Sequence, residues 1–181
     1  MIHHLDEPIG DPITMPNFEL SGRAVNEVAH VLNGEGGDPV FGGPKNLPML
    51  LHHFYGGIER GVNFREKKYL ASYQRCYDDL DNLFSPDFRK LIDQERDLES
   101  ILTPFFKART PELFIDKLRA INMRLKGAHL ILPKVERMTG AFGLTPHAPL
   151  FDERMARLSF RLAPHLILNE GVEKVILKKA G

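Results

Sequence analysis

The sequence has a single cysteine, no net charge and no long apolar segment. One cysteine, Cys76, excludes an intramolecular disulfide and a cysteine-rich zinc site. Lys and Arg together number 24, as do Asp and Glu, so the chain lacks the excess positive charge with which proteins bind nucleic acids or anionic membranes. No run of 18 apolar residues is present, so we expect no transmembrane helix.

The first seven residues lack the basic and apolar regions that begin a secretory signal peptide. We therefore expect a soluble, cytoplasmic protein that binds neither nucleic acid nor membrane. Apolar residues make up 43% of the 181, which argues against wholesale disorder and allows a packed core. This length predicts a single domain.

Acidic and basic residues are unevenly distributed along the chain. Residues 1–50 contain seven acidic and two basic side chains, so this segment carries a charge of −5 and the remainder carries +5. Lys174, Lys178 and Lys179 lie close to the C-terminus. The acidic front and the basic tail could face each other across a site, and ordinary scatter of surface charge is the alternative.

Prolines and glycines indicate little helix in the first part of the chain. Three prolines and a glycine between residues 6 and 17 predict an extended segment. A short helix is expected over residues 21–29, and the apolar residues 30–32 predict a short buried strand that ends at a glycine cluster. This strand needs a partner, which we expect near residues 1–6 or outside the chain.

Apolar residues at intervals of three and four predict a largely helical remainder. Ser85-Pro86-Asp87 and Thr110-Pro111-Glu112 each have the cap, proline and acid that are typical of a helix start. Gly127 is expected to end the second of these helices. Further helices are expected over 47–54, 69–84, 128–142, 152–162 and 171–180, with a loop over 145–149.

The strongest chemical signal is a glycine cluster over residues 33–44, which holds five glycines and two prolines and therefore should not form the interior of an element. A glycine turn after a strand exposes backbone N–H groups that can bind phosphate. Glu35 and Asp38 would repel phosphate unless a divalent cation lies between, so the turn predicts a Mg²⁺–phosphate site or a carboxylate for proton transfer. A tight structural turn is the alternative, because neither a Walker A loop nor G-x-G-x-x-G is present.

Other residues with chemical potential favour structural roles. Side chains of adjacent residues point in different directions, so His3-His4 and His52-His53 do not suit metal chelation. Cys76 falls on an apolar helical stripe and is expected in the core. A stripe of tyrosines is expected to pack rather than to stack on bases: Tyr69, Tyr73 and Tyr77.

Five ordered segments resemble motifs of the asparagine synthetase domain. Their order and approximate spacing are those of the family, and the matches cover residues 2–54 and 117–180, whereas residues 60–116 match only as generic helices. The segments are Leu5–Pro12 (L-D-E-P-x-x-D-P), Asn33–Gly43 (S-G-E-G-x-D-E-L-F-G-G), Leu132–Thr139 (L-x-K-V-D-R-M-S), Gly143–Asp152 (G-L-E-x-R-x-P-F-L-D) and Gly171–Ala180 (G-x-x-K-y-i-L-R-K-A).

The resemblance implies an ATP-dependent amide ligase, which activates a carboxylate as an acyl-adenylate, releases pyrophosphate and lets an amine attack. Asp38 matches the acid that holds Mg²⁺ on the pyrophosphate, and Glu35 matches the motif carboxylate beside the reacting centre. Lys174 matches the lysine that neutralises developing charge, a role that a fixed cation performs better than water. ATP and Mg²⁺ are the implied cofactors. The nucleotide- and pyrophosphate-binding loop is matched by Gly34, Gly36 and Gly37.

The sequence also departs from the family's pattern. The upstream S-G-G-x-D-S phosphate loop is absent, as is the glutaminase with its cysteine after the initiator Met, because position 2 is Ile. Pro39 replaces the second acid of the D-E pair, and Thr145-Pro146-His147 stands where E-x-R is usual.

The resemblance therefore implies a mainly α fold with a small β remnant, the C-terminal half of an α/β adenine-nucleotide alpha-hydrolase-like (PP-loop ATP pyrophosphatase) domain. We expect one partial domain over 1–181, with a strand and glycine-loop segment over 1–54 and a helical segment over 60–181. Two functions follow. One is a ligase half, inactive alone, that works with a separate N-terminal synthetase segment or as a homodimer. The other is a truncated, non-catalytic homologue that acts as a helical binding module.

Overall fold

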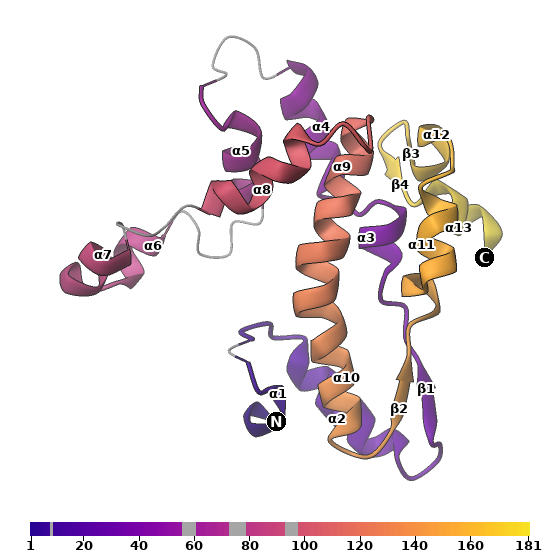
Figure 1. The fold of residues 1–181 in the computed structure, drawn as a ribbon. Coiled ribbons are helices and arrows are strands. Elements are labelled where there is room, and N and C mark those ends of the chain that lie inside the picture. Colours follow the sequence, from indigo (N-terminus) through magenta and orange to yellow (C-terminus); the bar gives the residue numbers. More distant parts are fainter. Residues whose placement is uncertain (8, 56–60, 73–78, 93–97) are drawn as a thin grey trace. The chain divides into compact units, whose positions relative to one another are not determined.

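Helices dominate the structure, a computed structural model shown in Figure 1, and the expected mainly α fold with a small β component is confirmed. The chain divides into two compact units, the first formed by residues 1–43 and 119–181 and the second by residues 44–118. The expected single domain, split at residues 54–60, stays a prediction. The described residues are 1–7, 9–55, 61–72, 79–92 and 98–181.

The first unit brings together the two ends of the sequence. Helices α1 and α2 both pack on α10, and α3 packs on the helix η1, which has π-type hydrogen bonds. Helix α9 (Phe114–Ile121) contains the boundary between the units. The remaining bounds are α1 (Ile2–Leu5), α2 (Thr14–Ala24), β1 (His30–Leu32), α3 (Gly37–Phe41), η1 (Asn122–Ile131), α10 (Leu132–Gly140), β2 (Thr145–His147), η2 (Pro149–Phe151), α11 (Glu153–Ser159), α12 (Pro164–Ile167), β3 (Leu168–Asn169), β4 (Val172–Glu173) and α13 (Val175–Ala180).

Helix α2 begins earlier than the prolines predict. The carboxylate of Asp11 accepts the Ile13 N–H at 3.3 Å, and the Asp11 carbonyl accepts the Thr14 N–H at 3.0 Å. Pro16 falls in the first turn, where its missing N–H costs no helical hydrogen bond. The helix expected over 21–29 therefore lies too late in the sequence, because Ser21 is inside α2 and donates to the Asn17 carbonyl at 2.7 Å.

Strand β1 is confirmed, and its partner lies within the chain. It pairs in parallel with β2, with His30 opposite Thr145 and Leu32 opposite His147. The loop expected over 145–149 was therefore wrong in part. Pro146 is tolerated because the ladder bonds on either side of it use the Thr145 N–H and the His147 carbonyl, and no donor is needed from Pro146 itself.

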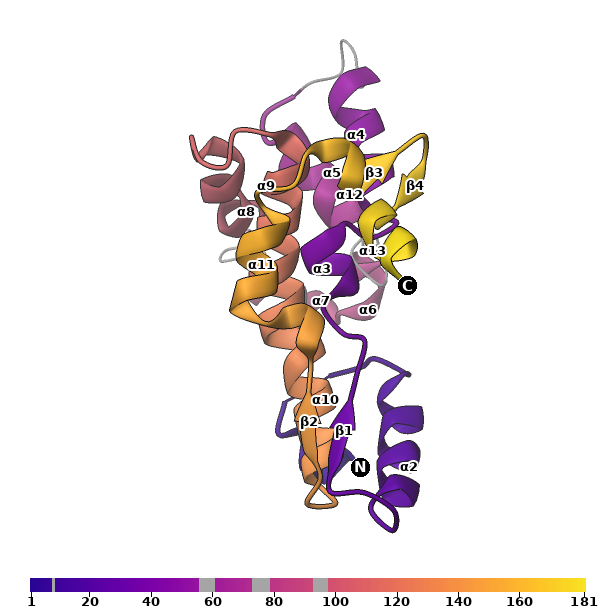
Figure 2. The ribbon, with the colours of Figure 1, turned by 90° about the vertical axis from the view of Figure 1, so that its right-hand side faces the viewer.

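The β1–β2 pair is not the buried strand that the apolar residues predicted. Leu32 is 79% exposed, and Val31 between the two exposed ends of β1 is only half-buried. Figure 2 shows the two strands side by side, with α10 and α2 nearby.

Gly37 and Gly127 have different structural roles from those expected. The cluster was expected to form no element, yet Gly37–Phe41 forms the short helix α3, with Pro39 in its first turn. Gly127 was expected to end a helix, but it lies inside η1. A Cβ on Gly127 would lie 2.3 Å from Cζ of Phe151, so this position needs glycine for close contact with that ring.

The C-terminal segment is assembled from short elements. Asp152, the first residue of the helix expected over 152–162, caps α11 by accepting the Arg154 N–H at 2.8 Å. The helix expected over 171–180 begins at Val175, because Val172 and Glu173 pair in antiparallel fashion with β3. Helix α12 packs on both α13 and β3.

Arg119 is among the largest fully buried side chains of the described residues, and sequence analysis gave it no role. Its Nε donates to the Val40 carbonyl at 2.9 Å and its Nη2 donates to Oγ of Ser159 at 2.6 Å. The guanidinium carbon lies 4.4 Å from the centre of the Phe160 ring. One side chain thus ties together α9, α3 and the end of α11.

The second unit is helical in the part that the structure describes. Helix α5 packs against both α4 and α8. The helix start at Ser85-Pro86 is confirmed, since Oγ of Ser85 accepts the Phe88 N–H at 3.3 Å, whereas the helix expected from Pro111 begins at Phe114. Its elements are α4 (Asn46–Tyr55), α5 (Phe64–Ser72), α6 (Leu80–Leu83), α7 (Pro86–Ile92) and α8 (Leu98–Lys107).

Packing in the second unit follows the predicted stripes only in part. Tyr69 is buried and lies edge-on to Phe106, as expected of a packing residue. On α4, however, Phe54 of the predicted apolar face is 67% exposed and Met49 is buried instead. Cys76 lies outside the described residues, as do Tyr73 and Tyr77. None of the helices in the described part of the chain has the length and apolar character needed to cross a membrane.

The contact between Gly127 and Phe151 predicts that a methyl group added at Gly127 destabilises the fold. We expect Gly127→Ala to lower the free energy of unfolding by about 1–3 kcal/mol, because the ring has to move away from the new Cβ. Gly140→Ala is the matched control, since nothing lies within 4 Å of a Cβ at Gly140 and the change should stay within about 1 kcal/mol. Urea unfolding followed by circular dichroism measures both. Equal effects of the two substitutions would contradict this account of Gly127.

Candidate functional site

The candidate site is built on the loop that connects β1 to α3. Oδ1 of Asn33 accepts the Glu35 N–H at 3.0 Å and so forms the local turn. Gly36 has a φ of 98°, and a Cβ there would lie 2.8 Å from backbone atoms of Leu150 and Phe151. Glycine is therefore required at Gly36 both for its backbone conformation and for the contact with η2.

The two charged residues predicted from opposite ends of the chain meet at this loop. Nζ of Lys174 donates to Oδ1 of Asp38 at 2.8 Å, across 136 residues of sequence. The Lys174 side chain is 27% exposed and the Asp38 side chain 40% exposed, so the pair is open to solvent. The expectation that the acidic front faces the basic tail is confirmed for this pair.

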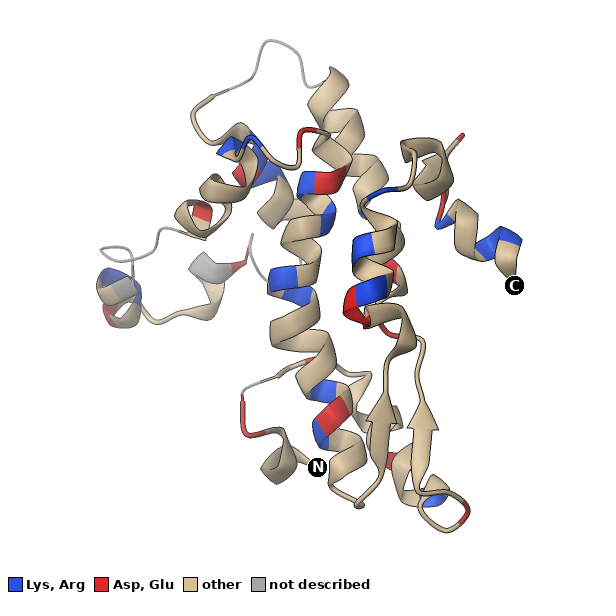
Figure 3. Ribbon diagram, turned by 45° about the vertical axis from the view of Figure 1, so that its right-hand side comes forward, with Lys and Arg blue, Asp and Glu red and all other residues tan. Residues whose placement is uncertain are grey.

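Lys174 contacts Asp38 from an uncommon backbone conformation. It follows β4 and precedes α13 with φ 54° and ψ 37°, the left-handed region that non-glycine residues seldom adopt. The carboxylate next to it in the sequence, Glu173, pairs with Lys178 at 3.4 Å. Lys174 pairs with Asp38 instead. A backbone hydrogen bond and the charge of Lys178 hold the pKa of the Glu173 carboxyl below its ordinary value. Figure 3 shows the basic residues that continue along α13.

Glycines surround the Asp38–Lys174 pair. A Cβ on Gly37 would lie 4.0 Å from Cδ of Lys174, so Gly37 borders the lysine side chain. A Cβ on Gly43 would lie 2.8 Å from Cγ of Asp38. Sequence analysis did not single out Gly43, although the F-G-G end of the motif was the signal that could have done so.

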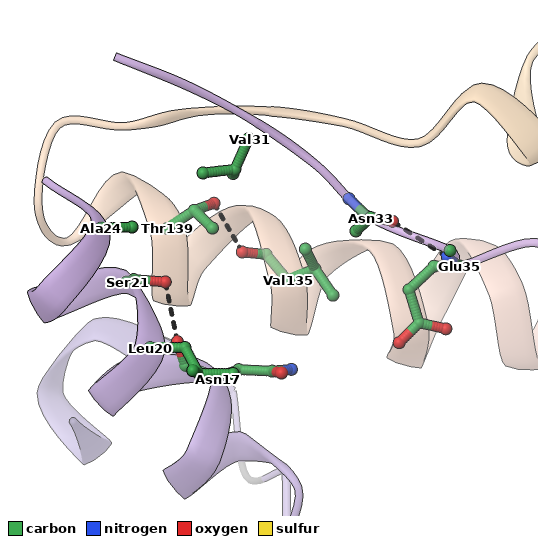
Figure 4. A pocket seen from close by; sticks show the side chains of 10 residues that line it. Asn17, Leu20, Ser21, Ala24, Val31, Asn33, Glu35, Val135 and Thr139 are labelled. Atoms are coloured by element: carbon green, nitrogen blue, oxygen red, sulfur yellow. Dashed lines mark hydrogen bonds between the residues drawn. The ribbon is translucent and has the colours of Figure 1, made fainter. Parts of the chain in front are cut away.

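Glu35 lies apart from the ion pair and lines a cavity of about 460 Å³ in the first unit. The walls come from α2, β1, the loop and α10, and the polar groups among them include Asn17, Asn33 and Thr139. In Figure 4 the side chains of Glu35 and Asn17 both extend toward the same part of this cavity. Sequence analysis missed Asn17, which lies in a segment that it took as extended.

The predicted site residues therefore form two groups. Gly36, Gly37, Asp38 and Lys174 lie together, whereas Glu35 faces the cavity, and a Cβ on Gly34 would have no neighbour within 4 Å. Within the described ranges, no hydrogen bond or ion pair joins Glu35 to the Asp38–Lys174 pair.

The described part of the chain contains no cluster of three or more His, Cys, Asp or Glu side chains that could hold a metal ion. Asp38 offers a carboxylate at the start of α3, beside Lys174, and the carboxylate of Glu35 in the same loop faces the cavity. Mg²⁺ is commonly held by one or two carboxylates together with phosphate oxygens, so the donor set fits a metal that arrives with a phosphate.

Comparison with known proteins places these residues in a family. The family model described as asparagine synthase matches residues 1–181. Asparagine synthetase [glutamine-hydrolyzing] 1 of Bacillus subtilis is 21% identical over 99% of the chain, which spans 32% of that protein. A protein of Mycobacterium bovis named "putative asparagine synthetase [glutamine-hydrolyzing]" is 23% identical over 99% of the chain and is covered to 31%. No solved structure matches.

The solvent exposure of the ion pair predicts a small contribution to stability. In a double-mutant cycle of Asp38→Ala and Lys174→Ala, we expect a coupling free energy of about 0.2–1 kcal/mol, as for other exposed pairs. Urea unfolding of the wild type, the two single variants and the double variant measures it. A coupling above about 3 kcal/mol would show that the pair acts as a buried structural bridge rather than as an accessible site.

Proposed function

The chain belongs to the asparagine synthase family, and from this we propose that it forms part of an ATP-dependent amide ligase of the PP-loop type. It spans about a third of the length of the relatives it matches, so the proposal concerns the part of the site that these residues build. The observation that carries it is the meeting of Asp38 and Lys174 on the glycine loop, at 2.8 Å.

Asp38 and Lys174 suit a bound Mg²⁺–pyrophosphate. The exposed Asp38 carboxylate would hold the ion, and Mg²⁺ when bound supplies charge neutralisation to the phosphate oxygens. The Lys174 ammonium has three N–H donors, and among the described residues it uses one, toward Asp38. Two donors are therefore left for oxygens of the leaving pyrophosphate.

Lys174 would lower the barrier by stabilising charge that develops on the leaving group. The ammonium is already placed by β4, α13 and Asp38, so little reorganisation is needed at the moment of reaction. Gly37 has no side chain between the loop backbone and Lys174, which would let a phosphate approach the backbone there, whereas Gly36 is filled on its Cβ side by η2.

Glu35 would act on the reacting groups themselves. Its carboxylate lines a cavity whose volume of about 460 Å³ is in the range of small-molecule sites. Leu20, Val31 and Val135 give the cavity apolar walls, and the amides of Asn17 and Asn33 supply hydrogen-bonding groups. We propose that Glu35 orients the amine or accepts its proton as the amide bond forms.

A non-catalytic binding module is the second candidate function. Pro39 stands where the family pattern has an acid, and residues 145–147 form a strand edge without the usual charged pair. Leu32, at 79% exposure on the adjacent strand, offers an apolar contact for a partner or a second copy.

Calorimetric titration with pyrophosphate, with and without Mg²⁺, distinguishes the two functions. We expect saturable Mg²⁺–pyrophosphate binding that weakens about tenfold or more in Lys174→Met, with or without Mg²⁺, which corresponds to about 1.4 kcal/mol. Asp38→Asn should remove only the part of the affinity that depends on Mg²⁺.

Matched controls are Lys179→Met on α13 and Glu153→Gln on α11, both exposed and distant in sequence from the loop. Each should bind like the wild type. A folded wild-type chain that binds neither form of pyrophosphate would favour the binding module. Equal binding by wild type, Lys174→Met and Asp38→Asn would place the pyrophosphate elsewhere.

A further inference from the structure

We propose that His30 and His147 form a two-histidine site for a divalent transition-metal ion, such as Cu²⁺ or Ni²⁺, across the β1–β2 pair. Nδ1 of His30 and Nε2 of His147 are hydrogen-bonded at 3.0 Å, so two imidazole nitrogens already face each other. The proposal does not rest on the pyrophosphate site, because it uses other residues and a different class of metal.

The parallel pairing of β1 and β2 places the two rings together. His30 lies opposite Thr145 and Leu32 lies opposite His147, so the two histidines are diagonal neighbours on one face of the sheet. Their rings are stacked at 5.3 Å between centres with an angle of 25° between planes. Sequence analysis examined only histidines adjacent in sequence, and 117 residues separate these two.

The two nitrogens are close enough to bind one ion. Two nitrogens bonded to one ion at about 2.05 Å lie about 2.9 Å apart at a right angle and about 3.35 Å apart at the tetrahedral angle. The observed 3.0 Å is the length of the present hydrogen bond and lies between these two values, so little movement of the rings is needed. Cu²⁺ and Ni²⁺ are chosen because nitrogen sites bind them more tightly than most other divalent first-row metals.

In the free chain one of the two nitrogens carries the proton of their hydrogen bond, and ion binding requires that ring to move its proton to its other nitrogen. Imidazole binds metal through the nitrogen that carries no proton, so His30 would keep its proton on Nε2 and His147 on Nδ1. Both side chains are exposed, which leaves room for the rings to tilt toward an ion and for water to fill its other positions. The described residues supply no third His, Cys, Asp or Glu ligand there.

An ion at this position would join the two strands that hold the candidate site. β1 leads directly into the glycine loop, and β2 leads into η2, whose backbone lies against Gly36. A ligand that binds only the folded state stabilises it, so the ion should raise the melting temperature by roughly 5 °C at about 100 times its Kd.

The test is titration of the chain, purified without a polyhistidine tag, with NiCl₂ and CuSO₄. Calorimetry should give one ion per chain, and the electron paramagnetic resonance spectrum of the Cu²⁺ complex should show coupling to nitrogen. His30→Ala and His147→Ala should each weaken binding at least tenfold and abolish the rise in Tm. Matched controls are His165→Ala and the double variant His3→Ala/His4→Ala, which should bind like the wild type.

Three outcomes would overturn the proposal. They are the absence of binding to a folded wild type, unchanged binding in His30→Ala and His147→Ala, and loss of binding in the His3/His4 control. If either alanine variant fails to fold by circular dichroism, His30→Asn and His147→Gln replace it and carry the same expectation. Asp38→Asn should leave Ni²⁺ binding unchanged, so failure here and failure of the pyrophosphate proposal are separable.

Discussion

The buried guanidinium of Arg119 is the interaction on which the first unit depends. A charge removed from water is tolerated only where its hydrogen-bond donors are satisfied, and here the Val40 carbonyl and the Ser159 hydroxyl accept from it. Val40 belongs to the helix that follows the glycine loop, and Ser159 ends α11. Helix α9, helix α3 and the end of α11 are therefore held together by one side chain.

A second constraint is the close contact that two glycines make with η2, one with its backbone and one with the ring of Phe151. Gly36 lies against η2, and Gly127 lies against the ring of Phe151, so the same turn of chain is in contact with glycines from two other segments. Close packing of this kind leaves no space for a Cβ, which means that these two positions fix where η2 runs. Lys174, which follows the β3–β4 hairpin and has a left-handed backbone conformation, contacts Asp38.

Local sequence signals predicted the parts of the fold that depend on local chemistry. The cap at Ser85, a helix that follows Asp152 and the strand at residues 30–32 lie where side-chain type and apolar pattern place them. The start of α2 was missed because prolines are compatible with a first helical turn, and the composition alone does not distinguish the two cases. Strand β2 was missed because its middle residue is proline, which is typical of loops, and only the pairing with β1 shows that the segment is a strand.

The sequence by itself determined the family resemblance, the glycine loop and the identity of Asp38, Glu35 and Lys174 as candidates, because these follow from residue types in a fixed order. Only the tertiary structure decided that Asp38 meets Lys174 while Glu35 faces a separate cavity. It also decided that Arg119 is buried and that His30 touches His147. Each of these depends on contacts between residues 40 or more positions apart, and such contacts leave no periodic or local pattern in the sequence.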